Sequence, residues 1–240
     1  MSKQLRQNLP AIVLFFGVLI VWETAVILLD IQQFLLPAPS VIWAAFTENF
    51  SRLVDVGWFT TKEAIGGFFI GCTAGILVAF ATARWATASE TLLPFAIAAT
   101  SVPIIAFAPI VNNWFGVDNP LSKMIIVAVI IFFPMMINTV RGLTLVDPAQ
   151  LELMRAYAAS ELDILFKVRL PNALPYMFNA FKIAASLSMI GAVVSEYFGG
   201  NRSALGIFIT QEAAQFRFAN AWAGSIIACI VGLTFYLIVL

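Results

Sequence analysis

Six apolar stretches dominate this sequence, and each approaches the length that a membrane-spanning helix needs. A helix crosses the hydrocarbon core of a bilayer with about 20 mostly apolar residues, because each residue adds only about 1.5 Å. The stretches are residues 11–29, 64–83, 92–111, 124–140, 183–198 and 222–240. They predict an all-α, polytopic membrane protein with about six transmembrane helices.

Composition excludes several classes of protein. The chain is 61% hydrophobic and only 11% charged, whereas a soluble domain is about 25% charged. Its formal net charge is zero, so no global field attracts nucleic acid. Lys3 and Arg6 precede the first stretch, which is too long for the core of a signal peptide and is followed by no cleavage motif. We therefore expect the first stretch to remain as a membrane helix.

No catalytic or metal-binding constellation stands out. The chain contains no His, which removes the commonest general base and metal ligand. Cys72 and Cys229 lie inside apolar stretches and are expected to act as small membrane residues rather than as a disulfide or metal pair. We expect no catalytic residue, no metal site and no cofactor in this chain.

The third and fifth stretches are the least regular. Pro94, Pro103 and Pro109 interrupt the third, and the carbonyls that prolines leave free must face protein or water. Six spans, or five spans and a re-entrant segment, are both open. The residues that we expect along a translocation pathway in these two stretches are Ser101, Pro103, Ser188, Ser195 and Glu196.

Glu196 has two interpretations. An acidic side chain within the hydrocarbon costs a few kcal/mol, so it usually faces a cavity or a partner. Glu196 also precedes Gly199 and Gly200, where the chain would reach the outer water interface. Both a pathway role and an interfacial position are open.

Two further patterns predict local packing. Gly67, Gly71 and Gly75 recur at four-residue steps and place three glycines on one helix face, where another backbone can approach. After a proline-rich turn, Ser40 begins an amphipathic helix whose apolar face includes Ile42 and Phe46. That helix lies either on the membrane surface or against the spans.

Basic residues indicate the orientation of the chain, because cytoplasmic loops carry an excess of Lys and Arg. With the N-terminus in the cytoplasm, eight basic residues lie on the cytoplasmic side and five lie outside. The cytoplasmic set is Lys3, Arg6, Arg84, Arg141, Arg155, Lys167, Arg169 and Lys182, and the outside set is Arg52, Lys62, Lys123, Arg202 and Arg217.

The longest polar stretch, residues 147–175, would then be cytoplasmic. Asp147 and Pro148 form a helix start, and Ser160 starts a second helix. We expect Pro171 to end this second helix and Pro175 to begin the fifth span. Two short capped helices would hold a fixed shape outside the lipid. We expect one domain, residues 1–240, with a two-helix cytoplasmic coupling loop at about 141–175.

This stretch resembles the EAA loop of the inner-membrane permeases of ABC-type importers. The family pattern is Glu-Ala-Ala, three residues, Gly, nine residues, an aliphatic residue, one residue, then Leu-Pro. The matching positions and those between them that we expect to couple to an ATPase are Glu152, Leu153, Met154, Ala158, Ala159, Ser160, Val168, Leu170 and Pro171. Leu153 and Met154 replace the two alanines, and Ala158 replaces the glycine that permits the turn.

Further motifs resemble the nitrate/sulfonate/taurine-type branch, over about residues 11–235. They are residues 36–40, 102–109, 114–116, 133–135, 174–176 and 194–196. The basic C-terminal tail of the family is missing, and we expect a truncated or unusually short tail.

The resemblance implies an importer of the bacterial inner membrane. Two permease subunits, identical or related, would form one pathway among membrane lipid. Cytoplasmic ATPase subunits, holding ATP and Mg, would receive the loops, and an extracytoplasmic substrate-binding protein would deliver cargo. The chain has no Gly-x-x-x-x-Gly-Lys-Ser/Thr phosphate loop, so by itself it is not an ATPase.

The alternative function is a self-contained secondary transporter or channel for a small solute. Two observations disfavour a secondary transporter. Only one intramembrane acid, Glu196, is evident, and no inverted repeat is visible. The cargo stays open among sulfonates, nitrate-like anions, and pyrimidine or flavin precursors.

Overall fold

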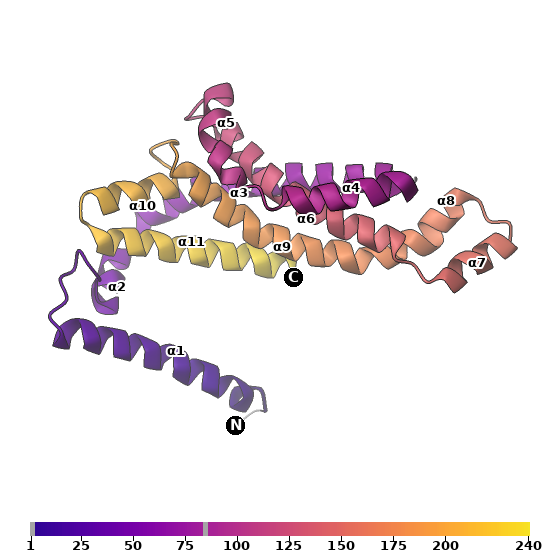
Figure 1. Ribbon diagram of the computed structural model, residues 1–240. Helices are drawn as coiled ribbons and strands as arrows, with labels where there is room; N and C mark the ends of the chain where they lie inside the picture. The colour runs from indigo at the N-terminus through magenta and orange to yellow at the C-terminus, as the bar shows by residue number, and fades with distance from the viewer. Residues whose placement is uncertain (1–2, 84–85) are drawn as a thin grey trace.

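The structure, a computed structural model, describes residues 3–83 and 86–240 (Figure 1). All regular structure in these ranges is helical. The elements are α1 (Lys3–Leu28), α2 (Pro39–Glu48), α3 (Phe50–Ala83), α4 (Ala86–Ala99), η1 (Ile104–Phe107), α5 (Ala108–Phe115), α6 (Pro120–Thr144), α7 (Pro148–Ala156), α8 (Glu161–Ile164), η2 (Leu165–Arg169), α9 (Leu170–Glu196), α10 (Leu205–Ala214) and α11 (Phe218–Val239). Arg84, which entered the charge comparison above, lies outside the described residues.

Within residues 3–83 and 86–240, five helices are long and apolar enough to cross a membrane. They occupy Leu9–Leu28, Phe50–Thr82, Pro120–Thr144, Glu161–Glu196 and Phe218–Val239. A sixth span requires counting Thr91–Ala99 and Ile104–Phe115 together, although these two helices meet at 74°. The all-α, polytopic prediction is confirmed, and the third predicted span is a bent pair rather than one straight helix.

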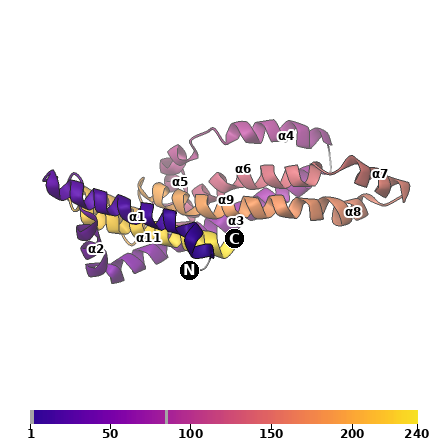
Figure 2. The same cartoon turned by 90° about the horizontal axis from the view of Figure 1, so that it is seen from below.

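Helices α3, α6 and α9 pack side by side and form the core of the molecule (Figures 1 and 2). The glycine face predicted on α3 meets α6. A Cβ at Gly71 would lie 2.6 Å from the carbonyl oxygen of Ala128, and one at Gly75 would lie 2.9 Å from that of Phe132. Only glycine therefore fits this close contact between backbones.

Helix α1 lies apart from this core (Figure 1), and only 6% of its spanning window is buried. Its Glu23 accepts hydrogen bonds from the backbone N–H and the hydroxyl of Ser40, at 3.0 and 2.6 Å. Helix α2 starts at Pro39 rather than at Ser40 and buries Ile42 and Phe46. Phe46 is part of the hydrophobic core, and α2 contacts α11. Of the two positions left open for α2, packing against the spans is the one observed.

The second helix of the polar stretch does not end at Pro171. Residues Glu161–Glu196 form one 36-residue helix, about 54 Å long at 1.5 Å per residue. The π-helical turn η2 ends at Arg169, two residues before Pro171. A proline ring crowds the carbonyl four residues earlier, and the wider π turn makes room for it. The prolines are thus carried within the helix instead of ending it.

Candidate functional site

The hairpin of α7 and α8 projects from one end of the molecule (Figure 1). Asp147 accepts a hydrogen bond from the backbone N–H of Ala149 at 2.9 Å and caps α7. At the other end of α7, the N–H groups of Ala158 and Ala159 donate to the carbonyls of Arg155 and Met154 at 2.9 and 3.0 Å. This pair of bonds is a Schellman motif, which terminates α7 with a fixed geometry.

Ala158 is the residue that turns the chain between the two helices. Its φ of 52° is left-handed, a conformation that costs an L-residue with a Cβ about 1–2 kcal/mol. The family pattern has glycine at this position, and the chain keeps the glycine conformation although it carries alanine.

The start of α8 is held by side chains. The Ser160 hydroxyl accepts from the backbone N–H of Asp163 at 3.2 Å and donates to the Asp163 carboxylate at 2.6 Å. Lys167 pairs with the same carboxylate at 2.6 Å. The predicted helix start at Ser160 is confirmed.

The base of the hairpin is clamped by Asn172. Its side-chain amide donates to the carbonyls of Gly142 and Leu145, at 2.7 and 3.0 Å. These carbonyls belong to the last turn of α6, so one side chain joins the two helices that enter and leave the hairpin. Ile164 is buried, which anchors α8 on its inner side. Sequence inspection missed Asn172, because only the tertiary fold places it beside the end of α6.

The outer side of the hairpin is apolar and exposed. Leu153 and Tyr157 lie four residues apart on α7 and its cap, and Leu162 and Phe166 lie four apart on the second helix; all four are more than half exposed. Residues at this spacing share a helix face. Of the predicted coupling residues, Glu152, Leu153, Ala158, Ser160 and Pro171 are exposed, and Met154, Ala159, Val168 and Leu170 are partly buried.

At the opposite end of the molecule, Glu196 is fully buried. Its carboxylate accepts from the Thr60 hydroxyl at 2.7 Å and from the backbone N–H of Gly206 at 2.6 Å. Thr60 in turn accepts from the N–H of Leu205 at 2.9 Å. The bonds join α3, α9 and the first turn of α10. Glu196 is therefore shielded from solvent within this subunit, and its depth in the membrane stays a prediction.

Two more charged side chains are buried near Glu196, and the sequence prediction missed both. Glu63 is 2% exposed and lies beside Glu196, and its Oε2 has no hydrogen-bond partner among the described residues. Lys123 is 1% exposed and donates to Asn112 at 2.8 Å, to the carbonyl of Val117 at 2.6 Å and to Ser122 at 3.2 Å.

These observations correct two premises. Lys123 lies within α6 and not in a loop, and Glu196 is not the lone buried acid that the sequence predicts, because Glu63 is buried beside it. The signal was weak because Glu63 and Lys123 each directly precede an apolar stretch, where a charge ordinarily marks the water interface.

A fourth buried charge, Glu212 on α10, lies at the same end of the molecule. It pairs with Arg217 at 3.1 Å and with Arg52 at 3.6 Å, and it accepts a hydrogen bond from Asn220 at 2.8 Å. These contacts hold α10 against the ends of α3 and α11. Among residues 3–83 and 86–240, no group of three or more Cys, Asp and Glu side chains is arranged to bind a metal ion.

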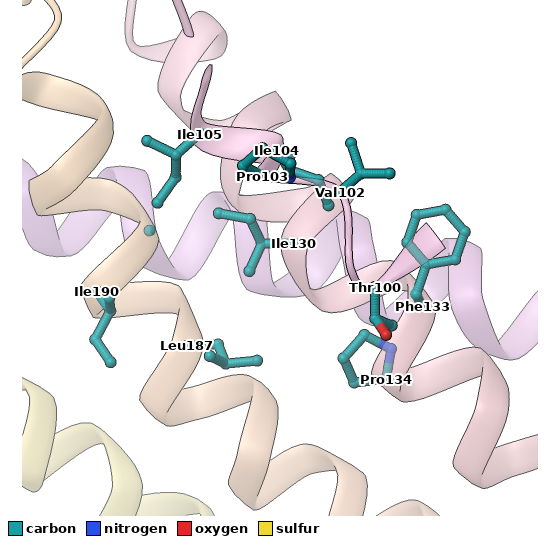
Figure 3. Close-up of a pocket in the computed structure, with 11 residues that line it drawn as sticks. Thr100, Val102, Pro103, Ile104, Ile105, Ile130, Phe133, Pro134, Leu187 and Ile190 are labelled. Carbon is teal, nitrogen blue, oxygen red and sulfur yellow. The ribbon is translucent and has the colours of Figure 1, made fainter. Parts of the chain in front are cut away.

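A cavity of about 400 Å³ lies where α4 bends into η1 (Figure 3). Its walls come from the bend, from α6 and from α9, and they are apolar apart from Thr100. The lining residues are Thr100, Val102, Pro103, Ile104, Ile105, Ile130, Phe133, Pro134, Leu187, Ile190 and Gly191.

Only Pro103 of the predicted pathway residues lines this cavity. Ser101 is exposed beside it. Ser188 and Ser195 are buried in α9, where their hydroxyls donate to the carbonyls of Ala185 and Ala192, both at 2.8 Å. These two serines and Glu196 lie inside the single subunit, and a pathway role for them stays a prediction.

Comparison with known sequences gives a consistent result. Residues 71–240 match the family described as binding-protein-dependent transport system inner membrane component. The chain is 27% identical to the formylaminopyrimidine transport permease protein ThiX of Halalkalibacterium halodurans, over 96% of this chain and 92% of the relative. It is 28% identical to the riboflavin transport system permease protein RibX of Chloroflexus aurantiacus, over 92% of this chain and 82% of the relative. It is 25% identical to the nitrate import permease protein NrtB of Leptolyngbya laminosa, over 87% of this chain and 76% of the relative.

Proposed function

This chain belongs to the binding-protein-dependent transport system inner membrane components, the permease subunits of ABC importers, and we propose that its α7–α8 hairpin is the docking surface for a cytoplasmic ATPase. A multi-pass permease of this family needs an energy source, and the hairpin is where a partner can act on it. The family assignment replaces the alternative of a self-contained secondary transporter.

The exposed apolar side chains of the hairpin carry this proposal. Leu153, Tyr157, Leu162 and Phe166 leave an apolar ridge uncovered at a place where the backbone is held rigidly. Exposed apolar patches with a polar rim are typical of protein interfaces, and a surface that is already ordered loses little conformational entropy on binding.

The hairpin also has a stiff connection to the rest of the molecule. The helix of residues Glu161–Glu196 runs without interruption from the ridge to Glu196 at the opposite end. Asn172 ties its first turns to α6. A displacement of the hairpin by the ATPase would therefore move α9, and with it the side chains that line the cavity.

We also propose the other components of the importer. ATP and Mg bind to the ATPase subunits, and this chain has no catalytic role in hydrolysis. A second permease subunit, identical or related, completes the pathway, and an extracytoplasmic binding protein delivers the substrate. The chain lies in the bacterial inner membrane with a cytoplasmic N-terminus, as one domain over residues 1–240.

The substrates for which the relatives are named include two chemical classes, heteroaromatic compounds and small anions, and the anions include aliphatic sulfonates as well as nitrate. ThiX and RibX are named for a formylaminopyrimidine and for riboflavin, which are heteroaromatic compounds, whereas NrtB is named for nitrate, a small anion. We propose that the substrate of this chain belongs to one of these two classes.

Co-purification with the ATPase tests the docking surface. Leu162→Glu and Phe166→Glu would place a charge in the apolar interface, and we expect at least a tenfold loss of ATPase capture, since hot-spot changes at interfaces cost about 2 kcal/mol or more. Gln150→Glu adds the same charge at an exposed position of α7 and should leave capture unchanged. Undiminished capture by both ridge variants would refute the docking surface.

A further inference from the structure

The bend between α4 and η1 leaves backbone acceptors without donors. The N–H groups of Thr100, Ser101 and Val102 bond backward, to carbonyls at positions 96–99. No backbone amide of the described residues donates to the carbonyls of Thr100, Ser101 or Val102. Pro103, which follows, has no N–H to offer. Three consecutive carbonyls are thus free at the centre of the bent pair.

In a bent pair that crosses or enters the membrane, free carbonyls cannot face lipid. The hydrocarbon core supplies no donor, so irregular backbone occurs there only against protein or along a water-filled cavity. The cavity of about 400 Å³ adjoins this bend, and Figure 3 shows Thr100, Val102 and Pro103 on its wall. This inference rests on the proposed function of an importer permease, and it takes this cavity as part of the translocation pathway.

The polar groups around the cavity are mainly acceptors. The Thr100 hydroxyl donates its proton to the carbonyl of Ile97 at 2.6 Å, so toward a ligand it offers only lone pairs. The Ser101 hydroxyl can donate or accept and therefore discriminates little. The other lining side chains, such as Phe133 and Ile190, are apolar. A cavity of this size with apolar walls and a few aligned polar groups is typical of a small-molecule site.

Among the residues that the structure describes, no Lys or Arg lines this cavity. Lys123 is buried elsewhere and is already bonded to Asn112, Val117 and Ser122. Lys182 lies five positions before Leu187 on α9 and is not part of the lining. Anion pathways use rings of Arg or Lys, and an unpaired anion beside free carbonyl oxygens would lose its hydration and gain no donor.

We propose that the substrate is an uncharged, flat heteroaromatic compound that carries N–H donors, and not a small anion. Its N–H groups satisfy the free carbonyls at the bend, and its ring faces lie against the apolar walls from α6 and α9. Aminopyrimidines and flavins share this chemistry.

The test uses the chain in lipid nanodiscs together with its ATPase subunits. Binding of four probes is measured by equilibrium dialysis: 4-aminopyrimidine and riboflavin for the two heteroaromatic classes, and nitrate and methanesulfonate for the anions. Leu187→Lys introduces a cation into the cavity wall, and Leu187→Met keeps its size and apolar character. Size-exclusion chromatography and ATPase capture show that each variant is folded and assembled.

We expect the wild type to bind at least one heteroaromatic probe and neither anion, and the probe that binds identifies the class. Leu187→Lys should weaken that binding about tenfold or more, because a buried charge must be hydrated or paired, while Leu187→Met should not. Binding of the anions alone would overturn the inference, as would binding of no probe by an assembled complex or equal binding by Leu187→Lys. Loss of ATPase capture by the wild type would count instead against the proposed function.

Discussion

Glu196, the last residue of α9, accepts a hydrogen bond at 2.6 Å from the backbone N–H of Gly206, in the first turn of α10. The approach is so close that a Cβ at Gly206 would lie 2.8 Å from the same carboxylate and 2.5 Å from the carbonyl of Val193. A buried carboxylate thus satisfies the free N–H groups at a helix start and joins two helices across a loop.

Glu196→Gln should destabilise the protein. The amide nitrogen that replaces one carboxylate oxygen cannot accept a hydrogen bond, so either Thr60 or Gly206 loses its acceptor. A hydrogen bond to a buried charged group contributes about 1.5–3 kcal/mol. Thermal unfolding in detergent measures the loss. Glu48→Gln, at an exposed position of α2, is the control, and equal melting temperatures for both variants would contradict the structure.

Gly71→Ala should loosen the contact between α3 and α6. The added methyl group would meet the Ala128 backbone at 2.6 Å, so the helices must separate, and overpacking typically costs about 1–3 kcal/mol. The expected result is a lower melting temperature. Gly17→Ala in α1 meets nothing within 4 Å and should be neutral or slightly stabilising. A neutral Gly71→Ala would show that the two backbones lie farther apart.

Ala158→Gly should stabilise the hairpin, because glycine adopts a positive φ without strain. The expected gain is about 1 kcal/mol, seen as slower amide hydrogen exchange at Ala159, whose N–H bonds to Met154. Ala156→Gly, two residues earlier and still helical, should have the opposite sign, because glycine lowers helix stability by about 1 kcal/mol. The same sign for both variants would argue against the left-handed turn.

Glu23→Ala should release α2 from α1. Ser40 would lose two acceptors, so we expect faster hydrogen exchange of its amide by about tenfold, since one to two hydrogen bonds of about 1 kcal/mol each are removed. Thr24→Ala is the matched control, because Thr24 bonds only within α1, to the carbonyl of Ile20. Unchanged exchange in Glu23→Ala would mean that this contact is not formed.

Local patterns predicted the local structure well. Asp147 and Ser160 cap helices where their sequence context places them, because a cap depends on residues within one turn. The four-residue spacing of the glycines likewise predicted that one face of α3 packs closely against another helix. The prediction that Pro171 ends the helix was wrong. The effect of a proline depends on whether the preceding turn can widen, and η2 is such a widened turn.

The predicted start of the second span shows where sequence reasoning reached its limit. It placed the span at residue 64, after Lys62 and Glu63, whereas α3 begins at Phe50. Charges in sequence mark a water interface only when nothing shields them. Here Glu63 is shielded by the packed helices, and no local signal reveals that shielding.

By itself the sequence determined the helices, their membrane character and the two capped helices of the hairpin, because apolar length, caps and glycine spacing act over a few turns. Only the tertiary structure decided which polar residues meet. The Thr60 hydroxyl and the Glu196 carboxylate are separated by 136 positions in the sequence yet lie 2.7 Å apart. The Asn172 amide bonds to the carbonyl of Gly142, 30 positions earlier. Such contacts depend on how whole helices pack, and a buried polar group is retained only where packing supplies its partner.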